Sequence, residues 1–174
     1  MRTPHGNVLW DLVTVLDDGA REFLEEQGGV AAIVISHPHY YGAHRDWAAQ
    51  LRCPVYLAIE DREWLSVDEE GGDYRWIEGA TETILPGVTA IKVGGHFPGS
   101  LCLHVAGADG GRLLVADSLV TVPSAKGPFA HPPKGVASYA FMWSIPNMVF
   151  TMLDTTRQAT VLIYLDRSRC RRTR

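Results

Sequence analysis

Four residues offer metal-ligand atoms at points where short apolar segments end: His37, His39, His96 and Asp117. Imidazole nitrogen suits zinc or iron, and three imidazoles with one carboxylate or water form an ordinary four-coordinate catalytic shell. In extended backbone, side chains i and i+2 point to the same side, so His37 and His39 are expected to face one ion. Pro38 between them fixes φ and is expected to keep this step out of a helix.

Three predicted strands position these side chains. Residues 31–36 form an apolar, β-branched run, so we expect a strand that is buried on both faces and delivers the first two histidines. Shorter apolar runs at residues 89–93 and 112–116 are followed by the third histidine and by the carboxylate. Because strand ends are rigid, the four side chains are expected to converge even without an ion.

Elsewhere in the chain, apolar runs bounded by Gly and Pro alternate with helical patterns, which favours an α/β (α+β) layered domain. Further strands are predicted at residues 8–12, 55–58, 81–85, 101–105 and 161–165. Helices are predicted at residues 18–27, 43–51, 61–65 and 146–158, and an exposed loop at residues 121–136. Turn signals such as Pro-Gly and Asp-Gly-Gly in the second half favour an antiparallel meander.

Size and charge narrow the class of protein. The 174 residues are 46% hydrophobic and 21% charged, which suits one core. We therefore predict a single domain over residues 1–165, followed by a basic tail at 166–174. A net charge of −4 does not supply a basic surface for nucleic acid or anionic membranes, so the expected partner is a small-molecule substrate.

No run reaches the roughly 18 to 20 apolar residues of a membrane helix, and the first residues lack the apolar region of a signal peptide. We therefore expect a cytoplasmic protein. Cys53, Cys102 and Cys170 are odd in number and widely spaced, which favours reduced thiols over a disulfide framework or a cysteine zinc site. Any metal is thus expected on histidine and carboxylate.

Four motifs together resemble those of the metallo-β-lactamase superfamily. They are Leu9-Trp10-Asp11, Val34-Ile35-Ser36-His37-Pro38-His39, Gly94-Gly95-His96-Phe97-Pro98-Gly99-Ser100 and Leu113-Leu114-Val115-Ala116-Asp117-Ser118. The Gly-His-x-Pro-Gly-Ser block is the most specific of them. The resemblance implies an αββα sandwich with the metal at one edge of two packed sheets. Both chain ends lack parts of the family pattern, so the sandwich is expected to be incomplete at both ends.

The chain departs from the family in its second-metal ligands. The usual His-x-His-x-Asp-His motif reads His-Pro-His-Tyr-Tyr here, with Tyr41 and Gly42 in place of the last two ligands. Asp117 matches the carboxylate that bridges both metals in the family, but no His follows His131 to match the final ligand. His44, about a helical turn beyond this loop, is interpreted as an exposed helix residue, with a replacement metal ligand as the alternative. We therefore predict one zinc ion per chain, with iron or manganese as alternatives.

The resemblance and the ligand set together predict a metal-dependent hydrolase, which cleaves an ester, thioester or amide bond of a small molecule through a metal-bound hydroxide. Asp117 and Tyr41 are the candidate catalytic residues, to orient water and to donate a hydrogen bond to an oxyanion. Asp11 is expected either to support a metal-binding histidine by a hydrogen bond or to cap a turn. The alternative function is a non-catalytic or truncated protein of this fold that binds a small molecule.

Overall fold

The computed structural model describes residues 1–66, 72–107, 110–118, 121–123, 139–141, 148–152 and 161–165. Contacts divide the chain into two compact units, residues 1–118 and residues 119–174. All four predicted ligands lie in the first unit. The single domain over residues 1–165 stays a prediction, and the basic tail at 166–174 lies outside the described residues.

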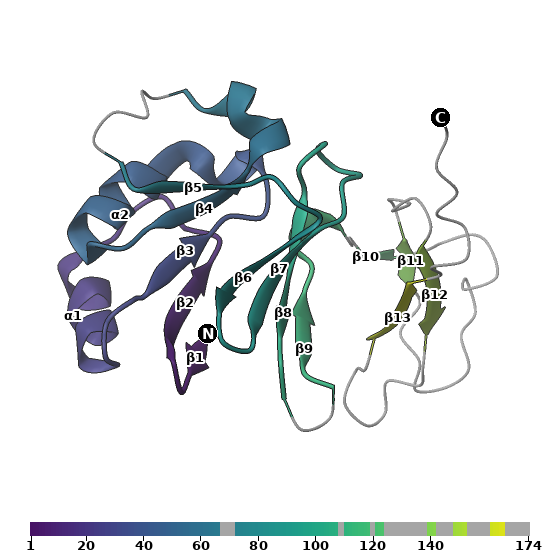
Figure 1. The fold of residues 1–174 in the computed structure, drawn as a ribbon, viewed down its shortest axis with the longest axis horizontal. Helices are drawn as coiled ribbons and strands as arrows, with labels where there is room; N and C mark the ends of the chain where they lie inside the picture. Colours follow the sequence, from purple (N-terminus) through teal and green to yellow (C-terminus); the bar gives the residue numbers. More distant parts are fainter. Residues whose placement is uncertain are drawn as a thin grey trace. The chain divides into compact units, whose positions relative to one another are not determined.

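A five-stranded sheet forms the amino-terminal part of the first unit (Figure 1). Its strands, in spatial order, are β1 (Arg2–Thr3), β2 (Gly6–Trp10), β3 (Ala32–Val34), β4 (Val55–Ala58) and β5 (Tyr74–Ile77). β2 to β5 are parallel, and parallel neighbours need crossover connections. Two of these crossovers contain α1 (Asp18–Glu26) and α2 (His44–Leu51), which lie on the same face of the sheet (Figure 1). The carboxyl ends of β2, β3 and β4 consequently meet at one edge.

The predicted antiparallel meander forms the second sheet of this unit. Its strands are β6 (Thr81–Leu85), β7 (Val88–Lys92), β8 (Leu101–Val105) and β9 (Arg112–Leu114), and each pairs antiparallel with the next along the chain. The expected turn residues lie where these strands reverse. Gly87, for example, has a φ of 79° between β6 and β7, which glycine adopts without strain.

Two apolar layers hold the first unit together, because successive residues of β3 face opposite sides of the sheet. Ala32 and Val34 pack between the two sheets, whereas Ile33 and Ile35 pack against side chains of α1 and α2. All four are at most 1% exposed, which confirms the predicted strand buried on both faces. Helices, sheet and sheet are thus three layers of the predicted sandwich, and the fold class is confirmed.

One helix predicted from the sequence falls in the second unit, where the structure has a strand. Residues 148–152 lie in strand β12 (Met148–Met152), which pairs antiparallel with β13 (Val161–Leu165), so the helix predicted over residues 146–158 is wrong there. The segment Val-Phe-Thr has high strand propensity, and pairing with the β-branched run of β13 outweighs the helical pattern. The strand predicted at residues 161–165 is confirmed.

The remaining described strands of the second unit are β10 (Thr121–Pro123) and β11 (Tyr139–Phe141), which form an antiparallel pair. The loop predicted at residues 121–136 therefore begins with a strand, and its residues 124–136 lie outside the described part of the chain. In the residues that the structure describes, no helix has both the length and the apolar character that crossing a membrane requires.

Several predicted boundaries also shift in the first unit. The strand predicted at residues 8–12 ends at Trp10, because Asp11 adopts a φ of 57°. The helix predicted at residues 61–65 is a 3-10 helix, η2 (Ile59–Trp64). Strand β5 was not predicted, since its short run Tyr-Arg-Trp-Ile mixes charged and aromatic residues.

His44 is buried, with 2% of its surface exposed, so its interpretation as an exposed helix residue is wrong. Its ring contacts two groups: Nδ1 the Tyr41 carbonyl, and Nε2 the Tyr74 hydroxyl at 2.9 Å. A neutral imidazole satisfies both, by donating from Nδ1–H and accepting at Nε2. His44 thus ties the segment after β3 to β5, and neither of its nitrogens is left over for a metal.

This packing predicts a specific loss of stability in acid. Burial lowers the pKa of His44 below 6.5, and Arg45 lowers it further, against the opposing effects of the Tyr41 carbonyl and Asp46. Because the unfolded state then binds the proton more tightly, the contribution of His44 is fully present above about pH 6.5 and declines below it. Between about pH 7.5 and about pH 5.5, the metal-free wild type should lose about 1 kcal/mol more unfolding free energy than His44→Gln.

Urea denaturation followed by circular dichroism at both pH values measures this difference. Equal losses in the wild type and in His44→Gln would contradict the neutral buried state of His44.

Candidate metal centre

The first two ligands leave the sheet at the end of β3. The backbone stays extended to His37 (φ −169°, ψ 169°), and Pro38 then opens a 3-10 helix, η1 (Pro38–Ala43). The prediction that Pro38 keeps the step to His39 out of a helix is therefore wrong, because the fixed φ and missing N–H of proline suit the first helical position. The turn still brings the His37 and His39 rings together, with centroids 5.0 Å apart.

His96 lies in the tight loop between β7 and β8. Gly94 and Gly95 ahead of it have φ values of 65° and 96°, which other residues rarely adopt. The loop closes around Ser100: its carbonyl accepts the Gly94 N–H at 3.1 Å, and its hydroxyl accepts the Phe97 N–H at 2.8 Å. The Gly-His-x-Pro-Gly-Ser block is therefore a self-closed loop that fixes the backbone of His96.

A buried carboxylate on η2 supports this loop, and no local sequence pattern predicted it. Asp61, which is fully buried on η2, accepts the Gly99 N–H at 2.8 Å. Gly99 approaches η2 so closely that a Cβ there would lie 2.5 Å from the Ala58 Cβ and 2.7 Å from Asp61 Oδ2. Only glycine fits this position, which explains its place in the motif.

Asp117 follows β9 in a short 3-10 turn, η3 (Ala116–Ser118). Ala116 ahead of it has a φ of 44°, a left-handed conformation that strains a residue with a Cβ. The Ser118 N–H closes the turn by donating to the Val115 carbonyl at 3.0 Å. The strained turn directs the Asp117 carboxylate toward the histidines, and 39% of that side chain stays exposed.

The four predicted ligands converge. Asp117 Oδ2 lies 3.4 Å from His37 Nε2 and 3.7 Å from His96 Nε2. His39 Nδ1 lies 3.4 Å from His96 Nε2. One ligand atom from each of the four residues lies within 4.8 Å of the other three, and they are the one such group within the described residues. His37 and Asp117 are far apart in the sequence but meet at one point, as we predicted from their positions at the ends of strands.

The electrostatics of the cluster suit a cation. His37 is 2% exposed, yet its Nε2 is a buried atom without a hydrogen-bond partner. Burial lowers the pKa of His37 to about 4, and the neighbouring His96 and His39 also lower it, against the attraction of Asp117. The ring is therefore neutral at pH 7 with a buried lone pair aimed at a carboxylate and two further imidazoles. A buried acceptor of this kind is costly unless something binds it, and the residues present fit a metal ion.

A chain of hydrogen bonds fixes the tautomer of His37. Ser36 Oγ lies 2.8 Å from His37 Nδ1 and 2.9 Å from Asp11 Oδ2, and the Ser36 N–H donates to Asp11 Oδ1 at 2.7 Å. Because the ionised Asp11 carboxylate only accepts, the Ser36 hydroxyl donates to it and accepts from His37 Nδ1–H. The proton is thereby held on Nδ1, which leaves the Nε2 lone pair free. Asp11 was expected to bond to a histidine or to cap a turn, and in the structure it is linked to His37 only through Ser36.

The two tyrosines of the motif occupy different environments. Tyr41, the predicted catalytic residue, is 5% exposed and packs in the apolar layer against the helices, and burial raises its pKa. Tyr40 instead has its ring edge-on to His37, with centroids 5.0 Å apart. Burial raises the pKa of Tyr40, and so do the charges of Asp117 and Asp11. The role of Tyr41 stays a prediction, while the packing favours Tyr40 as the phenol beside the site.

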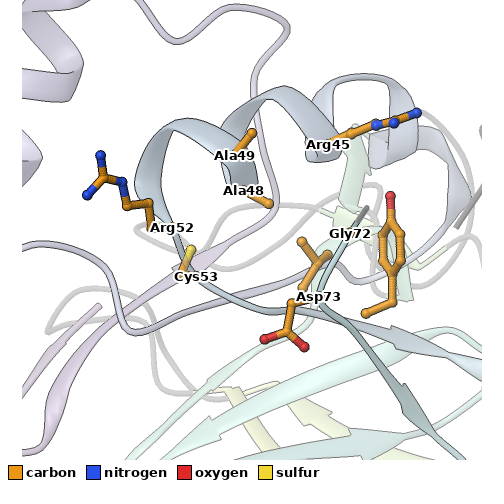
Figure 2. A pocket seen from close by; sticks show the side chains of 9 residues that line it. Arg45, Ala48, Ala49, Arg52, Cys53, Gly72 and Asp73 are labelled. Carbon is orange, nitrogen blue, oxygen red and sulfur yellow. The ribbon is translucent and has the colours of Figure 1, made fainter. Parts of the chain in front are cut away.

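A cavity of about 420 Å³ lies elsewhere in the unit, between α2 and the start of β5 (Figure 2). None of the four ligands lines it. Figure 2 shows Arg45 and Arg52 at opposite ends of α2, with their guanidinium groups directed apart. Burial raises the pKa of Cys53 in its wall to about 11, so the thiol stays protonated. The cavity therefore offers no chemistry comparable to that of the histidine cluster.

Comparison with known proteins agrees with this geometry. Residues 1–156 match the model of the metallo-beta-lactamase superfamily, and the chain belongs to that superfamily. It is 33% identical over 144 residues to the uncharacterized protein YmaE of Bacillus subtilis (strain 168), a match that covers 82% of this chain and 48% of that protein. The chain thus spans about half the length of this relative.

Solved structures are also similar to this chain. A metallo-beta-lactamase from Staphylococcus aureus subsp. aureus COL is 17% identical with a TM-score of 0.50, over 67% of this chain and 37% of that one. An N-acyl homoserine lactone hydrolase with its product bound at the catalytic metal centre is 23% identical with a TM-score of 0.45, over 57% and 44% of the two chains.

The cluster predicts which histidines matter for metal affinity. His96→Ala removes one of the converging nitrogens and should weaken zinc binding by more than about 100-fold, since even partners outside the ligand shell are worth 10- to 100-fold. His104→Ala is the matched control, because His104 Nε2 bonds to the Gly110 carbonyl at 2.9 Å and belongs to no ligand group. Competition with a chelating dye measures both affinities, and an unchanged affinity in His96→Ala would rule out this site.

The hydrogen-bond chain predicts that Ser36 matters for the metal although it is no ligand. Ser36→Ala removes the group that holds the proton on His37 Nδ1, so zinc affinity should fall about 10- to 100-fold. Ser66→Ala, at an exposed serine, is the control. The same competition assay compares them, and equal affinities in both variants would show that the hydrogen bonds from Asp11 through Ser36 do not orient His37.

Proposed function

We propose that this protein is a metal-dependent hydrolase that acts on an ester, thioester or amide bond of a small molecule, with one zinc ion held by His37, His39, His96 and Asp117. The observation that carries the proposal is the buried, unpartnered Nε2 of His37 among three other converging donors. Membership of the superfamily supports the same reading. Iron or manganese is the alternative metal, because imidazole and carboxylate also suit them.

The chain's own residues have distinct tasks in such a reaction. When bound, zinc supplies Lewis acidity that activates water and polarises a carbonyl near neutral pH. His37 stays neutral and correctly oriented through Ser36. Asp117 presents Oδ2 to His37 and His96 and is 39% exposed, so its carboxylate can accept a hydrogen bond from an attacking water molecule.

Tyr40 is our candidate for stabilising the oxyanion that develops on the substrate carbonyl. Its raised pKa keeps the phenol protonated at neutral pH, so that it donates a hydrogen bond. The contact between its ring and that of His37, with centroids 5.0 Å apart, supports this assignment. Tyr41, predicted for this task from sequence, is packed in the core instead.

The stoichiometry of one ion follows from what surrounds the cluster. A second divalent ion would need donors of its own to offset the repulsion between two like charges. Tyr41 is buried in the apolar layer, Gly42 has no side chain, and His44 uses both nitrogens within the protein. The lack of second-metal donors around the cluster in the described part of the chain favours the alternative function, a binding protein of this fold that keeps one metal without catalysis.

Metal analysis combined with a substrate panel tests the proposal. The purified protein should hold about one zinc per chain, and should hydrolyse p-nitrophenyl acetate or S-phenyl thioacetate in a way that a chelator abolishes and zinc restores. Asp117→Asn should lower kcat by about 100-fold or more, as for loss of a general base. Asp46→Asn, on the exposed face of α2, is the control.

Two results would contradict the proposal in different ways. Two ions bound reproducibly per chain would show that an unassigned residue completes a second site. A zinc-loaded protein that cleaves no ester, thioester or amide in the panel would favour the non-catalytic alternative.

A further inference from the structure

Two aromatic side chains form a wall beside the ligand group, which we call the Phe97–Trp64 wall. The Phe97 ring stacks on that of His37 with centroids 5.7 Å apart, and meets those of His39 and His96 edge-on at 5.0 Å each. The Trp64 ring meets Phe97 edge-on at 5.5 Å. Hydrocarbon surface therefore runs without a break from all three imidazoles outward to Trp64.

The wall is anchored at several points, so its geometry does not depend on a ligand. Phe97 is held through its N–H, which donates to Ser100 Oγ at 2.8 Å. The 3-10 helix η2 that carries Trp64 is joined to the second sheet by Lys92, whose Nζ lies 2.7 Å from the Glu60 carboxylate. Beside this ion pair, Asp61 accepts the Gly99 N–H. Polar contacts thus fix the backbone segments that carry Phe97 and Trp64.

Trp64 is nevertheless 53% exposed. A large indole that is exposed to water beside the histidine cluster gains free energy when something apolar covers it. Among the described residues, the one cation–π contact places the Arg62 guanidinium 5.4 Å from the centroid of the Trp76 ring, and not over Phe97 or Trp64. The exposed surface of the wall is thus hydrocarbon rather than charge.

We propose that the Phe97–Trp64 wall binds a neutral alkyl or aryl group on the acyl side of the substrate, which makes Phe97 and Trp64 specificity-determining residues. This inference rests on the proposed hydrolase function, because the reacting carbonyl is then fixed at the ligand group. Phe97 touches all three imidazoles, so a group lying on it is only a few bonds from that carbonyl. With that group on the acyl side, the substrate class is an ester, thioester or amide of an apolar carboxylic acid.

An acyl-chain series tests the wall through activity. The p-nitrophenyl esters of acetic, butyric, hexanoic and octanoic acid share one leaving group and differ only in apolar length. In the zinc-loaded wild type, kcat/KM should rise about twofold to fourfold per methylene, the factors expected for half and for full burial. The octanoate-to-acetate ratio of kcat/KM should fall at least tenfold in Trp64→Ala.

Phe23→Ala is the matched control, because Phe23 is 59% exposed on α1 and takes no part in the wall. It should keep the wild-type ratio. A ratio near one in the wild type, or an equal fall in Phe23→Ala, would overturn the inference while leaving the hydrolase proposal intact. Dependence on the length of the alcohol alone, in a series of alkyl acetates, would overturn the assignment to the acyl side.

Binding of uncleavable analogues separates this inference from the proposed function. Methyl ketones are neutral ester mimics without a leaving group, and the wall is present without metal. In calorimetry with metal-free protein, 2-nonanone should bind at least tenfold more tightly than 2-pentanone, and Trp64→Ala should remove most of that difference. Such binding in a protein that cleaves no ester would contradict the hydrolase proposal alone. Equal Kd values for both ketones would instead contradict the proposed binding of apolar groups by the Phe97–Trp64 wall.

Discussion

Ser36 joins the two sheets to His37, the first of the proposed metal ligands. Its N–H, its hydroxyl and its carbonyl all take part in these contacts. Its N–H and hydroxyl donate to Asp11 at the end of β2, and its hydroxyl accepts from His37. Its carbonyl accepts the Leu101 N–H at 2.9 Å, from the first residue of β8. The parallel sheet and the meander are thereby locked together directly behind the ligands. The positions of His37 and His96 relative to each other follow from this lock and from the closed loop between β7 and β8.

Backbone strain is concentrated around the same point. Three described non-glycine residues have a positive φ: Asp11 (57°), Arg52 (53°) and Ala116 (44°). Two of them serve the site, since Asp11 supports Ser36 and Ala116 aims Asp117. Such conformations cost about 1–3 kcal/mol each and persist only where the surroundings hold them. The fold therefore assembles the group of four side chains in advance, with one ligand atom of each within 4.8 Å of the others before any ion arrives.

The four converging residues and most strands were predictable because they follow local patterns: a β-branched run before His37, glycines before His96 and an apolar run before Asp117. What the sequence did not reveal depends on distant partners. Asp61 bonds to Gly99 across 38 positions, and His44 bonds to Tyr74 across 30, so neither structural role could be predicted from the local sequence. Tyr40 and Tyr41 are neighbours of identical type, and only the 3-10 turn at Pro38 decides which one faces the site. In the second unit, strand pairing between β12 and β13 overrode a helical pattern.

X-ray absorption spectroscopy of the zinc-loaded protein tests most directly whether the four side chains form one metal centre. The zinc edge should show a four-coordinate shell of nitrogen and oxygen near 2.0–2.1 Å without sulfur. The outer scattering should fit about three imidazole rings, for His37, His39 and His96, and should fall to about two in His96→Ala. A shell with sulfur, or with at most one imidazole, would show that zinc binds elsewhere and that the converging donors are not the metal centre.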